Sequence, residues 1–455
     1  MLNAREIIDI YISFFEKREH KKISNSSLVP QNDPTTLFTS SGMQPLISYL
    51  LGKSHPKGRR LVNVQNCFRA QDIEEIGDKR HTTFFRMLGN WSLGNYFKKE
   101  EIPWFFEFLT EGLKIDPSRL YVSVFEGYQD IPRDEDSARI WKQIFEGINI
   151  DPTDRIFFRG TSDNWWSRSG LPENMPAGEP GGPDTEVYFD LKPEQGELKG
   201  TFQELSDTGR LLEIGNSVFM EYQKQTDGSF KKLPQQNVDF GGGLERLLLV
   251  TQNLTDVFQT NLMLPIVRQI ELLTNKSYEQ YPKQMRIITD HFISATFIAS
   301  ENIMPSNKEQ GYVLRRLIRR GLDNLYQLGG KEIKPILETV VDKYKETDPM
   351  LTEKFEHVTG VILEEEQKYN HATNEAKRFI KNKYKTGDEL KGITEISADD
   401  AFVLYTTHGL SPTQIKSLGF IFNDKEFARK MEEHQLLSRQ GASKKFALES
   451  QKDLK

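Results

Sequence analysis

The chain has 455 residues, of which 37% are hydrophobic and 28% are charged, and its formal net charge is −6. This length exceeds what one hydrophobic core usually organises, so we expect about two to four domains. The composition excludes a disordered or fibrous protein, and no apolar run is long enough to span a membrane. The negative charge excludes a general attraction to nucleic acid, so any such binding requires a local basic surface.

The N-terminal segment, residues 1–18, is too acidic and interrupted for a signal peptide, and its apolar spacing predicts an amphipathic helix. Cys67 is the only cysteine, which excludes an internal disulfide framework and predicts a reducing, cytoplasmic compartment. The eight histidines are scattered without metal-ligand spacing, so no structural zinc site is predicted.

Residues up to about 255 alternate β-prone runs with turns. The connections between several runs are too short for crossover helices, so we expect antiparallel pairing. The predicted strands are RLVNVQNCFRA, HTTFFRML, LYVSVFE, EVYFDL and LLEIGNSVFMEYQK. From about residue 256, helical periodicity dominates. The sequence therefore predicts an α+β fold, with a sheet domain at 1–255, an all-helical domain at 256–440 and a polar tail at 441–455.

The stretch CFRAQDIEEIGDKRHTTFFRML carries candidate anion-binding residues. Arg69 ends one predicted strand and Arg80 and His81 begin the next, so a hairpin would bring these side chains to one face. Such a set suits a phosphate under nucleophilic attack. Phe84 and Phe85 point to opposite faces of their strand, so one packs in the core and the other can stack on a base. Taken alone, the stretch is also compatible with an ordinary hairpin that has surface cations.

Three glycines follow a short predicted strand and precede a predicted helix in NVDFGGGLERLLLV. Neither the P-loop nor the dinucleotide-binding spacing is present. Asp239 precedes the glycines, where it can hold an ammonium. Arg246 follows them in the first helical turn, where a cation opposes the helix macrodipole unless an anion lies between them. The alternative is that the glycines only turn the chain and that Glu245 complements the dipole.

The segment VLRRLIRR is predicted to form an amphipathic helix with an apolar arc and a basic arc. The basic arc holds Arg315, Arg316, Arg319 and Arg320. Four adjacent cations repel one another unless something anionic lies across them, which favours an RNA backbone as partner. A solvated basic face is the alternative interpretation.

Together these segments resemble the alanyl-tRNA synthetases, a family of class II aminoacyl-tRNA synthetases. SSLVPQNDPTTLFTSSGM is similar to the segment around motif 1, CFRAQDIEEIGDKRHTTFFRMLGNWSLGNYF to motif 2, and VDFGGGLERL to motif 3. RIITDHFISATFIASENIMPSNKEQGYVLRRLIRRG is similar to the tRNA-recognition domain. The resemblance implies a class II antiparallel sheet flanked by helices. It also implies a ligase that uses ATP and Mg²⁺ to join alanine to the acceptor stem of tRNA(Ala).

The resemblance further implies a role for individual residues. The implied catalytic residues are Arg69, on the α-phosphate of ATP, and Arg246, on the γ-phosphate and one face of adenine. Phe85 would stack on the other face, and His81, Met87 and Glu213 would also bind ATP, with Glu213 as a Mg²⁺ ligand. The residues implied for alanine are Asp239 for the ammonium, Trp166 and Val218 for the methyl group, and Asn216 and Gly241 beside them. Asn307 would read the G·U pair of the acceptor stem, with the four arginines nearby.

The sequence departs from the family at several positions. The loop after Arg69 is short, and AGEPGGPDTEVYFD replaces a cysteine-bearing segment. Gly215 stands where tryptophan usually precedes Asn216, and Thr406 stands where an aspartate usually partners Asn307. The short loop affects contacts expected in the transition state, and Thr406 affects reading of the wobble pair, so we expect tRNA discrimination to differ from the family more than adenylation does.

The chain ends where the family usually continues into editing and C-terminal domains, so we expect no editing activity in it. A pocket sized for alanine distinguishes glycine or serine by only about 1–3 kcal/mol, so an editing factor acting in trans is an expected partner. Two alternatives stay open. In the first, the chain is a catalytically weak synthetase-like RNA-binding protein. In the second, it is a ligase that activates alanine for a carrier other than tRNA.

Overall fold

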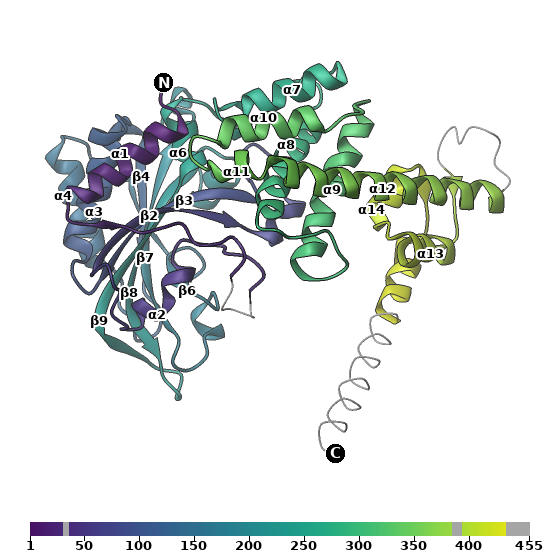
Figure 1. Cartoon of the computed structure of the whole chain (residues 1–455). Coiled ribbons are helices and arrows are strands. Elements are labelled where there is room, and N and C mark those ends of the chain that lie inside the picture. Colours follow the sequence, from purple (N-terminus) through teal and green to yellow (C-terminus); the bar gives the residue numbers. More distant parts are fainter. Residues whose placement is uncertain (31–35, 385–393, 434–455) are drawn as a thin grey trace.

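The computed structural model describes residues 1–30, 36–384 and 394–433 (Figure 1). The predicted tail at 441–455, the predicted helical residues 434–440 and part of the motif 1 segment therefore lie outside the described residues. Within the described ranges, no helix combines the length and the apolar character needed to cross a membrane.

A nine-stranded, mostly antiparallel sheet organises the first half of the chain, which confirms the predicted α+β fold (Figure 1). The strand order is β1-β2-β3-β9-β8-β7-β4-β5, and β6 pairs with β7. The β1–β2 and β4–β5 pairs are parallel and the other neighbours are antiparallel. The strands are β1 (Lys21–Lys22), β2 (Arg60–Phe68), β3 (Phe84–Leu93), β4 (Leu120–Phe125), β5 (Ile156–Arg159), β6 (Trp165–Ser167), β7 (Pro180–Asp190), β8 (Leu211–Lys224) and β9 (Phe230–Gly243).

Helices pack on this sheet and cover much of its apolar surface. Helix α1 forms as predicted, because Asn3 and Glu6 make a capping box and Ile7, Tyr11 and Phe15 bury one face. It packs on β2, β3 and α6, while α3 packs on β8 and α4 on β4 and β5. The bounds are α1 (Ala4–Glu16), α2 (Ile47–Leu50), α3 (Lys98–Glu107), α4 (Glu135–Gly147), α5 (Phe202–Asp207) and α6 (Leu244–Thr251).

The second half is helical apart from a two-stranded sheet of β10 (Thr394–Glu395) and β11 (Phe420–Ile421). Helix α8 is its central element, since every side chain from Met285 to Ser300 is buried. It packs on α9, α10, α12 and β3. The helices are α7 (Leu264–Thr274), α8 (Pro282–Ser300), α9 (Glu309–Gln327), α10 (Lys334–Tyr344), α11 (Met350–Glu353), α12 (Phe355–Tyr384), α13 (Ala398–His408) and α14 (Pro412–Ser417).

Two sequence expectations differ from the structure. The three glycines do not follow the strand as predicted, because they are its last residues, and α6 begins directly at Leu244. The segment from 256 to 274 is not one helix, because the helix α7 starts only at Leu264, with Pro265 in its first turn, where the missing proline N–H has no helical acceptor.

The two halves meet where Phe84 of β3 stacks on Phe297 of α8, with ring centroids 3.9 Å apart. Both rings are buried, so Phe84→Ala leaves a cavity and should lower the free energy of unfolding by about 3–5 kcal/mol. Chemical denaturation measures this change. The control Leu272→Ala removes a side chain that is 78% exposed, and it should change stability by less than about 0.5 kcal/mol. Equal effects of the two variants would contradict the conclusion that the Phe84–Phe297 stack holds the two halves together.

Candidate active site

Most of the predicted ligand-binding residues lie on one face of the central strands. In the register, Gly241 faces Gly89 on β3 and Asn216 on β8, and Asp239 faces Trp91 and Val218. Directly paired residues of an antiparallel sheet share a face, and so do residues two apart along a strand. Asp239, Val218, Asn216 and Gly241 therefore share one surface, together with Met87, which faces Gly243.

A cavity of about 250 Å³ lies at one end of this surface. Arg69 follows the last residue of β2, and Phe85 is the second residue of β3. The Arg69 guanidinium lies 4.9 Å from the centroid of the Phe85 ring at this cavity. Arg80 also borders the cavity, although its Nη1 donates to the Ser206 carbonyl at 2.7 Å. All six residues predicted to bind ATP line the cavity, namely Arg69, His81, Phe85, Met87, Glu213 and Arg246. Their roles stay predictions, but the structure brings them together.

Arg246 and Glu213 form an ion pair at the rim of this cavity. Nη1 of Arg246 donates to Oε2 of Glu213 at 2.6 Å and to the Glu213 carbonyl at 3.0 Å. Both side chains are about one-third exposed, so solvent and ligands reach them. A phosphate with Mg²⁺ can exchange both partners at once, because the phosphate replaces the carboxylate on Arg246.

Glu213 fits a Mg²⁺ ligand of the kind that works with a bound nucleotide. Mg²⁺ is commonly held by one or two carboxylates together with substrate phosphates and water. Across residues 1–30, 36–384 and 394–433, the structure contains no group of three or more His, Cys, Asp or Glu side chains able to hold a metal. Glu213 is the carboxylate that pairs with Arg246 at this cavity, so its role as a Mg²⁺ ligand stays a prediction that its position suits.

His81 sits between two carboxylates of the preceding loop. Its Nδ1 lies 2.7 Å from Oδ2 of Asp78, and its Nε2 lies 3.8 Å from Oε2 of Glu75. Asp78 also accepts the backbone N–H of His81 and of Arg80. The acidic loop that looked like a simple connection in the sequence thus orients the imidazole at the cavity.

Asp239 occupies the other end of the surface. Its Oδ1 accepts a hydrogen bond from the Trp91 indole at 2.7 Å. Burial raises the pKa of the Asp239 carboxyl to about 7, and the Trp91 hydrogen bond opposes part of that shift. Buried Val218 lies beside Asp239, and half-buried Trp166 packs with Trp91 and Met220. The predicted ammonium and methyl sites are therefore adjacent.

Asn216 has a fixed amide orientation. Its Nδ2 donates to Oε1 of Glu186 at 3.2 Å, while its buried Oδ1 has no hydrogen-bond partner among the described residues. Burial raises the pKa of the Glu186 carboxyl. Burial also raises the pKa of the Asp184 carboxyl, to about 8. Asn164 donates to Asp184 at 2.8 Å. A free acceptor at Oδ1 suits a cationic ligand such as an ammonium.

Trp91, Asp184 and Glu186 are site residues that sequence reasoning missed. The two-residue period of RMLGNWSL places Met87, Gly89 and Trp91 on one face, so this signal was available for Trp91. The carboxylates gave no local signal, because their position depends on the pairing of β7 with β8.

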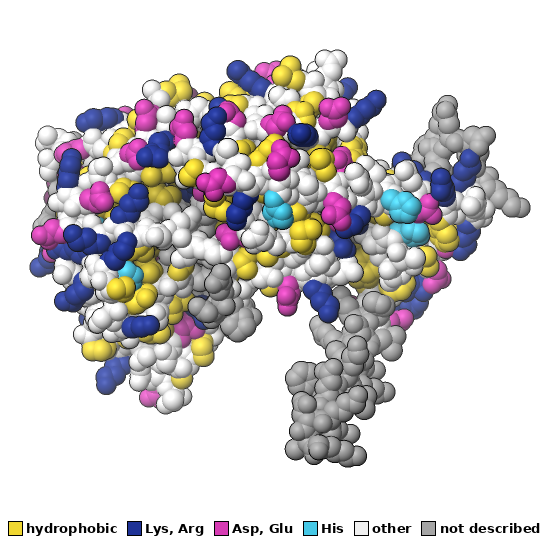
Figure 2. Space-filling view, viewed as in Figure 1, with side chains coloured by type: hydrophobic (Ala, Val, Ile, Leu, Met, Phe, Trp, Pro, Cys, Tyr) yellow, Lys and Arg dark blue, Asp and Glu magenta, His cyan; other side chains and the backbone are white. Residues whose placement is uncertain are grey.

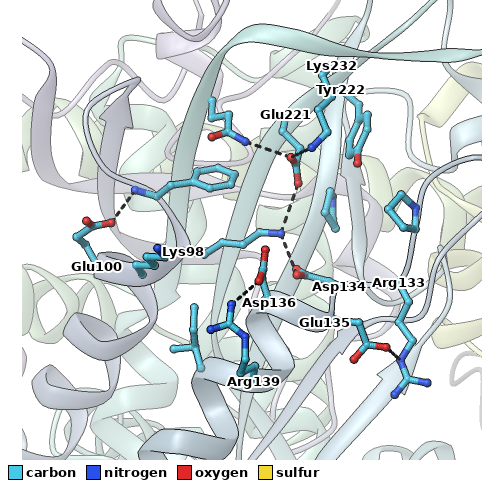
Figure 3. Close-up of a pocket in the computed structure, with 16 residues that line it drawn as sticks. Lys98, Glu100, Arg133, Asp134, Glu135, Asp136, Arg139, Glu221, Tyr222 and Lys232 are labelled. Carbon is cyan, nitrogen blue, oxygen red and sulfur yellow. Dashed lines mark hydrogen bonds and ion pairs between the residues drawn. The ribbon is translucent and has the colours of Figure 1, made fainter.

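A second cavity, of about 480 Å³, is shown in Figure 3 and contains none of the predicted catalytic residues. Lys98 reaches into it with Nζ 2.9 Å from Asp134 and 3.4 Å from Glu221. The same ammonium lies over the ring of Phe219, which alternates with Val218 and so faces the opposite side of the sheet. The labelled cations Lys98, Arg133, Arg139 and Lys232 each have a carboxylate partner. The cavity with Arg69 and Arg246 is therefore the candidate active site.

Comparison with known proteins identifies the family of the chain. A family described as tRNA synthetases class II (A) matches residues 6–455. The alanine–tRNA ligase of Borreliella afzelii (strain PKo) is 40% identical over 457 residues, which cover 96% of this chain and 73% of that protein. The chain belongs to the class II alanyl-tRNA synthetase family. The alanine–tRNA ligase of Treponema pallidum (strain Nichols) is 39% identical, covering 98% of this chain and 73% of its own.

The alanine–tRNA ligase of Acetivibrio thermocellus is 36% identical, covering 96% of this chain and 49% of that protein. Among solved structures, apo histidyl-tRNA synthetase of S. aureus is similar with a TM-score of 0.31 and 12% identity, covering 55% of this chain and 65% of that chain. A likeness at that level adds no argument to the sheet topology described above.

The basic arc of α9 differs from its sequence-based interpretation. The chain itself supplies the anions, since Glu365 lies 2.7 Å from Arg319 and 3.7 Å from Arg315, and Glu74 pairs with Arg316 and Arg320. These two carboxylates offset part of the charge of the four arginines, so the repulsion among them is weaker than the sequence alone indicated. On the face shown in Figure 2, cationic and anionic side chains are interspersed in the same way.

The four arginines of this synthetase chain also differ in exposure. Arg319 is buried, whereas Arg316 remains half-exposed beside a cavity of about 470 Å³ between α9, α13 and α14. Asn307 accepts a hydrogen bond from Arg315. A role of these residues in tRNA binding stays a prediction, and Arg316 is the best exposed of the four.

Thr406 stands where the family usually has an aspartate, so this position offers no carboxylate to Asn307. The Thr406 hydroxyl donates to the Phe402 carbonyl at 2.9 Å. Asp399 pairs with Lys430, and Asp400 accepts from Tyr384 at 2.6 Å while it helps to cap α13. Both carboxylates therefore have partners within the chain.

The different settings of Arg319 and Arg316 predict different effects of substitution. Arg319→Met leaves Glu365 buried with a weaker set of partners, so it should lower the free energy of unfolding by about 3–5 kcal/mol. Arg316→Met breaks an exposed pair and should cost less than about 1 kcal/mol. Thermal or urea unfolding of the two variants measures both values. A destabilisation by Arg316→Met as large as that by Arg319→Met would refute the assignment.

Proposed function

We propose that the chain is an alanine–tRNA ligase that makes alanyl-adenylate from alanine and ATP and transfers the alanyl group to tRNA. One observation carries this proposal. The register of β3, β9 and β8 sets an ammonium-binding carboxylate, Asp239, two residues along the strand from Gly241, which borders the arginine-lined cavity. Two substrates held at these places would meet above the glycines.

In the first step, a carboxylate oxygen of alanine attacks the α-phosphorus of ATP. The new oxygen–phosphorus bond forms as the bond to the bridging oxygen of the β-phosphate breaks, and pyrophosphate leaves. Both reactants are anions, so Arg69 and Arg246 lower the barrier by offsetting charge that grows on the phosphates. Bound Mg²⁺ would add charge neutralisation, with Glu213 as its protein ligand. Phe85 would stack on adenine and hold the nucleotide in line.

At the amino end, Asp239 is the counter-ion of the alanine ammonium. Oδ1 of Asn216 accepts a second hydrogen bond, because Glu186 already occupies the amide nitrogen. Val218 and Trp166 line the methyl pocket. Glycine lacks only the methyl group and serine adds only a hydroxyl, so this pocket discriminates against them by about 1–3 kcal/mol. An editing factor acting in trans is part of the proposal for this reason.

In the second step, a ribose hydroxyl of the terminal adenosine of the tRNA attacks the activated carbonyl. The carbon–oxygen ester bond forms and AMP leaves, so no protein nucleophile is needed. We place the acceptor stem along Asn307, Arg315 and Arg316, supported by the position of the two arginines beside the α9–α13–α14 cavity and by the hydrogen bond from Arg315 to Asn307. The solitary, buried Cys67 favours a cytoplasmic setting.

Alanine-dependent exchange of pyrophosphate into ATP tests the first step. Arg69→Ala removes one of the two cations on the reacting phosphates and should slow exchange by about 100-fold or more. Arg139→Ala, an arginine at the cavity of Figure 3, is the matched control and should exchange at the normal rate. Near-normal exchange by folded Arg69→Ala would remove Arg69 from the mechanism. An unmodified chain that exchanges with no small amino acid would leave the RNA-binding alternative.

The raised pKa of Asp239 predicts a pH dependence of alanine binding. Protonation removes the negative charge that holds the ammonium, so at saturating ATP the KM for alanine should rise as the pH falls below about 7 and level off above it. Steady-state exchange between pH 5.5 and 8.5 measures this. Asp239→Asn should raise the KM and abolish the pH dependence. A KM for alanine that stays constant across this range in the unmodified chain would argue against ionised Asp239 as counter-ion.

A further inference from the structure

Arg86 is a buried cation near the start of β3. It lies on β3 between Phe85 and Met87, so its side chain points to the face opposite the ATP cavity. Only 1% of the residue is exposed. Its guanidinium is 4.8 Å from the ring centroid of Tyr344 on α10.

Glu245 holds Arg86 at two points. One carboxylate oxygen accepts the backbone N–H of Arg86 at 2.9 Å, and the other accepts Nε at 3.1 Å. The ladder between β3 and β9 ends at the pair Met87 and Gly243, where the chain turns into α6. The Glu245 side chain therefore replaces the next backbone partner that β3 would need, and it ties the end of β3 to the first turn of α6.

The two hydrogen bonds from Arg86 to Glu245 form a clamp between residues that are next in sequence to two predicted adenine contacts. Phe85 precedes Arg86 and Arg246 follows Glu245, and both Phe85 and Arg246 line the nucleotide cavity. A change in the Arg86–Glu245 distance moves β3 against α6, and so changes the width of the slot between Phe85 and Arg246. A small displacement of a bound reactant from its productive position can slow its reaction strongly.

Stability alone explains the clamp poorly. Burying a guanidinium and a carboxylate costs about as much free energy as their attraction returns, and apolar side chains of similar volume are often as stable. Nη2 of Arg86 has no hydrogen-bond partner among the described residues, which adds to that cost. The pair instead fixes the position of β3 relative to α6, because Glu245 holds both the backbone N–H and Nε of Arg86.

The helical half completes the arrangement. Nη1 of Arg86 donates to Oγ1 of Thr347 at 2.9 Å, and the Thr347 hydroxyl lies 2.8 Å from Oδ2 of Asp348. Asp348 also accepts from Asn66 of β2 at 2.8 Å. The segment after α10 thus reaches the back of the two strands that hold Arg69 and Phe85.

We propose that Arg86 is a positioning residue that makes the width of the ATP slot depend on docking of the helical half, through Glu245 on one side and Thr347 on the other. The inference rests on the proposed function, because the slot is assigned to ATP. It assigns Thr347 and Asp348, which are remote from both substrates, to nucleotide binding rather than to RNA recognition.

Steady-state pyrophosphate exchange separates this role from a purely structural one. Arg86→Lys keeps the charge but loses the forked donor geometry, so the KM for ATP should rise about fivefold to tenfold while the KM for alanine stays within about twofold. Thr347→Val keeps the shape and removes the acceptor, and it should raise the KM for ATP about threefold or more. The double variant should be less than additive, because both changes act on one network.

Arg5→Met is the matched control for Thr347→Val. Arg5 contacts the same segment of the helical half, since its Nη1 donates to the Glu346 carbonyl at 3.1 Å, but it does not contact Arg86. This control should leave the KM for ATP unchanged. Isothermal titration of the full chain with ATP and Mg²⁺, without alanine, should reproduce the losses of affinity in the two test variants.

The inference is overturned if folded Thr347→Val binds ATP as tightly as the unmodified chain, or if Arg5→Met weakens ATP to the same degree. It is also overturned if the KM values for ATP and alanine rise together. Thr347→Val keeps the test open if Arg86→Lys does not fold. If the unmodified chain shows exchange with alanine but the variants behave normally, only this inference fails. If the unmodified chain shows no exchange, the proposed function itself fails.

Discussion

The antiparallel pairing of β3 with β9 is the constraint on which the rest of the candidate site depends. It aligns residues about 150 positions apart, with Met87 against Gly243, Gly89 against Gly241 and Trp91 against Asp239. The space at this contact is narrow, most of all at Gly89. A Cβ on Gly241 would lie 3.0 Å from the sulfur of Met87, and a Cβ on Gly89 would lie 2.2 Å from the Trp91 ring. The same pairing places only glycines on β9 between Asp239 and Leu244 apart from Phe240, which points to the opposite face, so β9 itself puts no side chain between the two predicted substrate sites.

Local sequence patterns predicted the parts of this arrangement that depend on period and turns. The segment LLEIGNSVFMEYQK forms β8, and RLVNVQNCF forms β2. The opposite faces of Phe84 and Phe85 were also predicted, and the structure confirms them. Phe84 stacks in the core, and Phe85 lies under Arg69 at the cavity. These features follow from the two-residue repeat of a strand, which any single strand displays.

The remaining features depend on partners that are distant in sequence. The sequence offered Glu245 only as a possible complement to the helix dipole; it does lie in the first turn of α6, and it also accepts two hydrogen bonds from Arg86 on another element, which no local pattern indicated. The arginines of α9 were interpreted as a basic face whose charge needs an external anion, but Glu74 and Glu365 each pair with two of them and offset part of that charge. The predicted strand ended before the glycines, because β-propensity cannot show that the pairing with β3 continues through them. In each case tertiary contacts, not local preference, decide the outcome.

The central claim is that alanine and ATP meet on the face between Asp239 and Arg246. A crystal structure of the chain with a non-hydrolysable sulfamoyl analogue of alanyl-adenylate tests it most directly. The account predicts that the ammonium lies within hydrogen-bond distance of Asp239 and of Oδ1 of Asn216, with the adenine between Phe85 and Arg246. An analogue bound in the cavity around Lys98, or one whose ammonium has no contact with Asp239, would contradict the account.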